Sequence, residues 1–460
     1  MTETPASSAP PAARNRPVIP RPSSRADHRL GPRLGWTSAA GWIVCGLALL
    51  AYAAGPVVGR SSLFGAAIAL VAVIGSVPVF SRISGRFPGI EMAGLMRLSL
   101  GLKLLATLPR FEGREDSVDY YRVGSVLADS FRRLDFVVDT GREIPGTGSV
   151  RYFTGLVEVF TFEDEFATFV VFSLLGFIGL VTFVLAFRVA MPNVDATRYA
   201  VLLLFWPSLV YWPSSIGKES LMLFALAFVA FGSASVLRGR RHGLVVTVLG
   251  LLGVGLVRPH VALIAVTALI VALIVRAPGR GLTSSVARAL LIVGLIVGGS
   301  VASDVTEALF DIDGLNPTGL AAALDLVNSR SSQGGSSFAA ARIDGISEYP
   351  WGFVTVLFRP FPNEASSLPM LATSIEALVL AGLVVAAVPR LLASLRTVRD
   401  EAYIAYAVAF TTVFVYLFSA LGNFGILARQ RAMTMPLVLV IVALPTAKER
   451  VRQRRIGDGP

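Results

Sequence analysis

Two carboxylates stand in the motif DSVDYY, which runs from Asp116 to Tyr121. Asp116 and Asp119 are separated by two residues, and Tyr120 follows directly. A carboxylate can take a proton from a hydroxyl as a general base, or hold a divalent metal ion beside a phosphate. An Asp or Ser at the start of a helix also accepts hydrogen bonds from the free amides of the first turn. Both roles fit the sequence, since one aspartate can cap a helix while the other acts.

A second set of side chains is cationic and recurs in short segments far apart in the chain. These residues are Lys218 in PSSIGKES, Arg258 and His260 in RPH, Arg359 in FRPFPNE, and Arg429 and Arg431 in ARQR. An arginine fork binds phosphate oxygens through two parallel hydrogen bonds, and fixed cations stabilise the charge of a departing phosphate. Each of these residues alone is also an ordinary charge at a helix end, whose long side chain reaches the membrane surface. Two neighbouring carboxylates, Glu219 and Glu364, are expected to orient the cations or a metal.

The composition is that of a membrane protein. Of the 460 residues, 54% are hydrophobic and 15% are charged, and the mean hydropathy is +0.68. Soluble domains carry about 25% charged residues, so this chain has too few to coat a water-soluble surface, and a soluble enzyme is excluded. One cysteine and three histidines offer neither a disulfide framework nor a cysteine-based metal site. A divalent ion at the carboxylates is the one cofactor left open.

Apolar stretches close to the roughly 20 residues that cross a membrane recur along the chain. They predict an all-α polytopic protein with about twelve transmembrane helices. The expected spans are 37–57, 62–80, 89–109, 167–187, 199–213, 221–237, 244–257, 261–275, 286–303, 367–388, 402–419 and 433–447. Residues 1–35 are expected to be a disordered basic tail and 448–460 a second basic tail. Between them, residues 36–447 form the transmembrane domain, with long outer loops at 110–166 and 304–366.

The net charge of +11 follows the predicted topology. With both termini in the cytoplasm, the basic short loops lie on the cytoplasmic side and the outer segments are net negative. This is the positive-inside pattern of a multi-pass protein of the plasma membrane, so the partner it implies is the lipid bilayer and not nucleic acid. The pattern predicts that Ser215 and Arg258 face outward, whereas Arg240 and Arg280 face inward.

Charged residues inside the predicted spans need partners. Arg97 and Lys103 make 89–109 the least apolar span, and they are expected to face other helices. Glu376, in the tenth span, is either a buried partner for one of the cations of the short outer segments, such as Arg359 or Arg431, or an acid in a transport pathway. Arg97 or Lys103 could also pair with it. The apolar segment 351–361 is too short to span the membrane and is expected at the outer interface.

The motifs resemble those of bacterial, notably actinobacterial, polytopic proteins of surface-polysaccharide assembly, which are similar to GT-C glycosyltransferases and O-antigen-polymerase-like proteins. The resemblance covers about residues 110–436 and rests on DSVDYY, GTGSVRYFTGL at 146–156, PSSIGKES, RPH, FRPFPNE and ARQR. It implies an enzyme that uses a polyprenyl-phosphate or polyprenyl-diphosphate sugar donor and a glycan acceptor on the outer leaflet. In that interpretation Asp116 or Asp119 activates the acceptor, and the five cations hold the phosphate together with His260, with Tyr120, Glu219 and Glu364 in support.

Two other functions stay open. The first is a transporter or a flippase for lipid-linked saccharides, which would use Glu376 with Arg97 or Lys103 as an intramembrane coupling pair. Transporters commonly carry internal repeats and polar residues near the midplane, whereas this sequence shows no repeat and gathers its polar residues toward one surface. The second is a non-enzymatic scaffold of a polysaccharide export complex.

Overall fold

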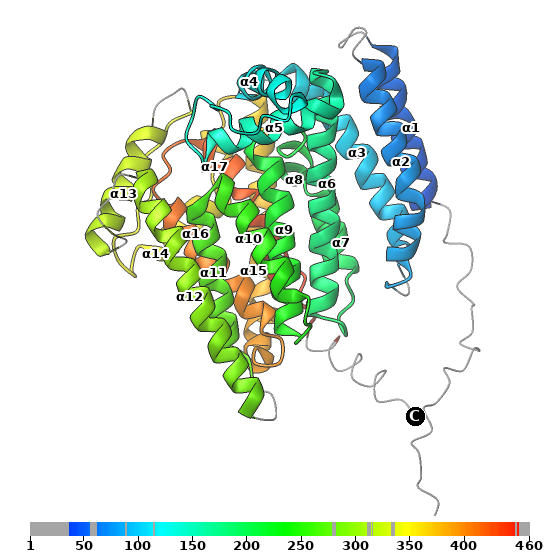
Figure 1. Ribbon diagram of the computed structural model, residues 1–460. Helices are drawn as coiled ribbons and strands as arrows, with labels where there is room; N and C mark the ends of the chain where they lie inside the picture. The colour runs from blue at the N-terminus through cyan, green and yellow to red at the C-terminus, as the bar shows by residue number, and fades with distance from the viewer. Residues whose placement is uncertain are drawn as a thin grey trace, which may run out of the picture.

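The chain is all-helical in the residues that the structure describes (Figure 1). The structure is a computed structural model, and it describes residues 36–55, 62–87, 90–113, 116–277, 282–310, 314, 316–332, 336–446 and 449. The helices are α1 (Trp36–Ala54), α2 (Ser62–Ser84), α3 (Met92–Glu112), α4 (Asp116–Arg132), α5 (Thr147–Thr161), α6 (Glu165–Ala190), α7 (Thr197–Phe205), α8 (Pro207–Tyr211), α9 (Lys218–Leu237), α10 (Gly243–Val257), α11 (Pro259–Val275), α12 (Leu282–Phe310), α13 (Pro317–Ser331), α14 (Tyr349–Phe358), α15 (Leu368–Ser394), α16 (Tyr403–Phe418), α17 (Phe424–Arg431) and α18 (Met435–Val442). The expected tail 1–35, nearly all of the tail 448–460, and Arg280 lie outside the described residues.

Within the described ranges, seven helices are long and apolar enough to cross a membrane. They are α1, α2, α3, α6, α9, α15 and the part of α12 from Leu291 to Ala308. The helices α17 and α18, bent by 62° at their junction, make an eighth if they form one span. The prediction of an all-α, multi-pass membrane protein is therefore confirmed. The count of about twelve spans stays a prediction, because the other expected spans fall on helices that are shorter or broken.

The exposure of the helices separates an interior from a lipid-facing periphery. The helix α9 is almost entirely buried inside the bundle, whereas α1, α2 and α15 leave most of their apolar surface uncovered. In water such surface would be an aggregation hazard, but hydrocarbon chains cover it without cost. At the centre, α9 packs tightly against α10 and α6. A Cβ at Gly250 would lie 2.6 Å from the backbone of Val229, so this glycine permits the close approach of α10 to α9.

The two cations that the sequence placed inside this span, Arg97 and Lys103, face other helices, as predicted. Arg97 and Lys103 are buried, and α3 packs between α1 and α6. Arg97 donates a hydrogen bond to the hydroxyl of Ser38 at 2.8 Å and lies over the ring of Trp42. The helix α3 is therefore long and apolar, with these two charges turned into the protein.

The short helix α8 supplies the hydrogen-bond partners of both Lys103 and Glu376. At the start of α8, the amide of Ser208 donates to the carboxylate of Glu376 at 2.9 Å. At its other end, the ammonium of Lys103 donates to the carbonyls of Leu209 and Val210 at 2.9 and 3.3 Å. A broken helix inside a membrane must satisfy its free end groups within the protein, and an acid at the N-terminus with a base at the C-terminus also matches the helix dipole.

The expected ion pair of Glu376 with Lys103 or Arg97 is therefore wrong in the described structure. Glu376 and Lys103 hold opposite ends of α8, and Arg97 is engaged with Ser38 near α1. Arg431 of α17, one of the cations that the sequence offered as a partner, lies close enough to Glu376 for the two charges to interact. The sequence shows that these charges need partners. The interruption of the helix at Trp206 and Pro207 decides which backbone groups become available to them.

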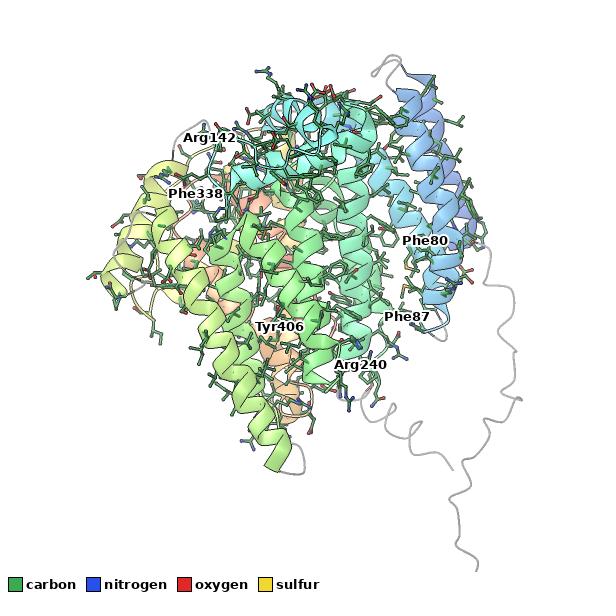
Figure 2. All side chains as sticks on the ribbon, in the orientation of Figure 1. Phe80, Phe87, Arg142, Arg240, Phe338 and Tyr406 are labelled. Atoms are coloured by element: carbon green, nitrogen blue, oxygen red, sulfur yellow. The ribbon has the colours of Figure 1, made fainter. Side chains whose placement is uncertain are left out.

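The two long outer loops are largely helical. The first, 110–166, contains α4 and α5, which pack on each other and lie across one end of the bundle (Figure 1). The second, 304–366, contains α13 and α14. The segment 351–361, expected at the outer interface, forms most of α14 and packs against α15 and α16. We refer to the end of the bundle covered by α4 and α5 as the α4–α5 end. Figure 2 shows Arg142 at this end and Arg240 at the opposite one.

Candidate functional site

A cavity of about 1060 Å³ opens at the α4–α5 end. Its walls come from the loop between α4 and α5, the starts of α9 and α11, and parts of α12, α13, α16 and α17. One part of the lining is polar and includes Lys218, Arg258, His260 and Gln430. The rest is mainly apolar, and comes from residues such as Leu263, Ile264, Leu324, Val327, Leu417 and Phe418. The cavity therefore suits a molecule with one charged end and one apolar end.

Lys218 is a cation of this cavity whose charge stays available. The tight turn before α9 places it, because the hydroxyl of Ser220 donates to the carbonyls of Ser215 and Gly217 at 3.1 and 3.0 Å. Lys218 is half-buried, and no described residue forms a hydrogen bond or ion pair with its ammonium. It is also the first residue of α9, where the helix dipole adds further positive potential. An anion in the cavity would meet both charges.

Arg258 lies beside Lys218 and is held from two sides. It stands between α10 and α11, where Pro259 starts the second helix. Its guanidinium forms an ion pair with Glu219 at 3.6 Å and a hydrogen bond with the side-chain oxygen of Gln430. Its side chain is 10% exposed, so the group is fixed in position at the cavity wall. Glu219 thus contacts one of the cations that it was expected to orient, and its role in a site stays a prediction.

The aspartates of DSVDYY lie outside the cavity. Both belong to the first turn of α4. Asp116 forms an ion pair with Arg429 at 3.2 Å, and Asp119 forms one with Arg151 at 2.7 Å. Their side chains are 66% and 51% exposed, and neither lines the cavity. The Asp116 carboxylate thus joins α4 to α17, and the Asp119 carboxylate joins α4 to α5.

Tyr120 connects this layer with the cavity wall. It is buried. Burial, and then the negative charges of Asp116 and Glu219, raise the pKa of its phenol, which therefore stays protonated at physiological pH. Tyr120 accordingly serves as packing and as a neutral polar group near Arg258. Its supporting role in a site stays a prediction.

Arg359 and Arg431 form a separate cluster. Arg359 makes an ion pair with Glu364, and its guanidinium lies over the rings of Phe338 and Phe424 at 4.4 and 5.2 Å. Arg431 is buried and donates to the backbone carbonyls of Leu357 and Arg359 at 2.6 and 3.0 Å. Neither residue lines the cavity. Because their donors are engaged within the protein, these two arginines join α17 to the end of α14.

The structure therefore gathers half of the predicted phosphate-binding residues at the cavity. Lys218, Arg258 and His260 line it, whereas Arg359, Arg429 and Arg431 do not. Sequence reasoning missed the charged and amide side chains of Arg142, Glu143, Arg330 and Gln430 in the lining. The adjacency of Arg142 and Glu143 to the motif GTGSVRYFTGL, within an outer loop, was a usable signal for two of them. In the part of the chain that the structure describes, no group of three His, Cys, Asp or Glu side chains could hold a metal ion.

A buried carboxyl lies between α4 and α5. Glu158 of α5 accepts a hydrogen bond from the hydroxyl of Ser125 at 2.7 Å, and it packs against Gly124. Its side chain is buried. Burial, together with the nearby carboxylates of Glu163 and Glu165, raises the pKa of Glu158 to about 8, although Ser125 and Arg132 act in the opposite direction. The pair of helices that covers the cavity therefore contains a carboxyl that is protonated at neutral pH.

Scans against protein-family models, curated proteins and solved structures found no match to this chain.

Proposed function

We propose that this chain is an enzyme of the plasma membrane that transfers a sugar from a polyprenyl-phosphate or polyprenyl-diphosphate carrier to a surface glycan. The observation that supports it most is the cavity, which joins the unpaired ammonium of Lys218 and the fixed guanidinium of Arg258 to long apolar walls. A polyprenyl phosphate has the same two parts. Its phosphate would lie against the two cations, and its isoprenoid chain would lie along α11, α13 and α16.

The same cations would assist the reaction. When the sugar leaves its carrier, negative charge develops on the phosphate oxygen, and cations already in place stabilise that charge without reorganisation. The transporter hypothesis has less support, because Glu376 and Lys103 are engaged at the two ends of α8 and form no coupling pair. Assembly of a polysaccharide on the outer leaflet is the process in which such an enzyme would act.

The proposal is tested with farnesyl phosphate, a short soluble polyprenyl phosphate, and the purified full chain. We expect farnesyl phosphate to bind more tightly than either inorganic phosphate or farnesol, since the first lacks the apolar part and the second lacks the charge. Replacing Lys218 with Met removes a charged contact worth about 1.5–3 kcal/mol. The affinity for farnesyl phosphate should then fall roughly 10- to 150-fold.

A matched control is Arg132→Gln, which removes a cation of α4 that pairs with Asp129 and Glu163 and does not line the cavity. Its affinity for farnesyl phosphate should stay within about twofold of the unchanged protein. Equal binding of farnesol and farnesyl phosphate, or an unaltered affinity in Lys218→Met, would refute the anion site. Normal surface glycan in cells that lack the chain would refute the role in glycan assembly.

A further inference from the structure

The loop between α4 and α5 brings one carboxylate to the cavity. Glu143 is the sole Asp or Glu among the described residues that line it. The residue is exposed, so it belongs to the open side of the cavity, whereas Lys218 and Arg258 are more buried. No described residue forms a hydrogen bond or ion pair with the Glu143 carboxylate. It is therefore both accessible and unengaged.

The backbone of this loop is held in place around Glu143. The carbonyl of Glu143 accepts a hydrogen bond from the amide of Gly148 at 3.1 Å, and the amide of Gly146 donates to the carbonyl of Leu256 in α10 at 2.9 Å. Gly148 has no space for a side chain, since a Cβ there would lie 2.4 Å from the carbonyl oxygen of Arg142. These contacts fix the position of Glu143 relative to α5 and α10.

Three other carboxylates of this end form ion pairs. Asp116 and Asp119 pair with arginines of α17 and α5, and Glu219 pairs with Arg258. In each of these ion pairs the arginine occupies a carboxylate oxygen that would otherwise be open to the hydroxyl of a ligand. Glu143 has no such partner among the described residues and faces the volume where a ligand would lie.

We propose that Glu143 is the catalytic base that activates the glycan acceptor, in place of Asp116 or Asp119. This inference rests on the proposed transferase function. The acceptor oxygen forms a bond to the anomeric carbon of the sugar while the bond from that carbon to the carrier phosphate oxygen breaks. The hydroxyl proton passes to the Glu143 carboxylate, and the carrier phosphate leaves with the electron pair, its charge stabilised by Lys218 and Arg258.

The test replaces Glu143 in cells whose own copy of the chain has been removed, and measures surface glycan output together with the amount of protein in the membrane. Glu143→Gln keeps the size of the side chain but removes the proton acceptor, so the rate of glycan output should fall by about 10²- to 10⁴-fold. Glu143→Asp should retain part of the output. In Glu143→Ala, added sodium formate should restore part of the output, while sodium chloride should not.

Binding of farnesyl phosphate to purified Glu143→Gln separates this inference from the proposed function. Affinity within about twofold of the unchanged chain, combined with lost output, supports a base that acts after binding. A matched control is Asp139→Asn in the same loop, which keeps the acceptor for the amide of Gly141 and does not line the cavity; its output should be normal.

Three outcomes would contradict the assignment. Normal output from Glu143→Gln at equal protein levels would show that no base is needed at this position. A parallel loss of output and of farnesyl phosphate binding, without formate rescue, would show a structural or headgroup-binding role. A failure of the unchanged chain to bind farnesyl phosphate would instead overturn the proposed function itself.

Discussion

Replacing Glu158 with Gln tests how α4 and α5 are held together over the cavity. The carboxyl of Glu158 is buried between the two helices, and one of its oxygens accepts a hydrogen bond from Ser125. The other oxygen has no hydrogen-bond partner among the described residues. Since the pKa of this group is raised from 4.5 to about 8, the carboxyl is neutral in the folded protein at pH 7. A Gln side chain has nearly the same size and the same lack of charge.

The direction of the pH effect follows from proton linkage. Between about pH 4.5 and pH 8, the unfolded chain loses the proton of Glu158 whereas the folded chain keeps it. Stability therefore falls as the pH rises through this window and levels off above it. A rise of the pKa from 4.5 to about 8 corresponds to about 5 kcal/mol in a fully dry site. Solvent screening and relaxation of the protein reduce this to about 1–2 kcal/mol.

The assay compares apparent Tm values of the purified unchanged chain and Glu158→Gln, at one heating rate, from pH 5 to pH 9. At pH 5 the two Tm values should be nearly equal. As the pH rises to 8, the Tm of Glu158→Gln should become about 2–4 °C higher than that of the unchanged chain. The difference should not increase further at pH 9. The exposed residue Glu112 supplies the control, since Glu112→Gln should follow the unchanged chain throughout. Parallel curves for the unchanged chain and Glu158→Gln would refute the reasoning.

Three further predictions follow from the geometry of the helices. Lys103→Met leaves the carbonyls at the end of α8 buried without a donor, at about 1–3 kcal/mol each; thermal unfolding should show a lower Tm, and an unchanged Tm would contradict the role. Arg359→Gln should lower the free energy of unfolding by about 2 kcal/mol through loss of a partly buried ion pair. It should leave the affinity for farnesyl phosphate unaltered, because Arg359 lies outside the cavity. A weaker affinity would place Arg359 in the site. In a Cys45→Ala background, an impermeant thiol reagent applied to intact cells should label Val137→Cys and not Arg240→Cys. Both positions are exposed, and they belong to opposite ends of the bundle. The reverse labelling pattern would invert the topology.

Hydropathy was sufficient to determine the class of the fold. The tendency of an apolar stretch to form a membrane helix depends on the residues of that stretch alone, so the sequence predicted the long helices found at α1, α2, α3, α6, α9 and α15. It also required Arg97 and Lys103 to face the protein, because a charge that faces lipid is costly. The gathering of Lys218, Arg258 and His260 followed from the same topology, since each stands at a helix end on one side of the bundle.

Only the tertiary structure decided which charges are engaged and which are available. The sequence could not assign Asp116 to Arg429, which stands more than three hundred positions away, or Glu376 and Lys103 to opposite ends of α8. It also could not distinguish Glu143, which lines the cavity, from the equally acidic Asp119, which is paired with Arg151. Ion pairs depend on contacts a few ångströms long between helices distant in the chain, and such contacts are set by packing, which no local pattern of residues records.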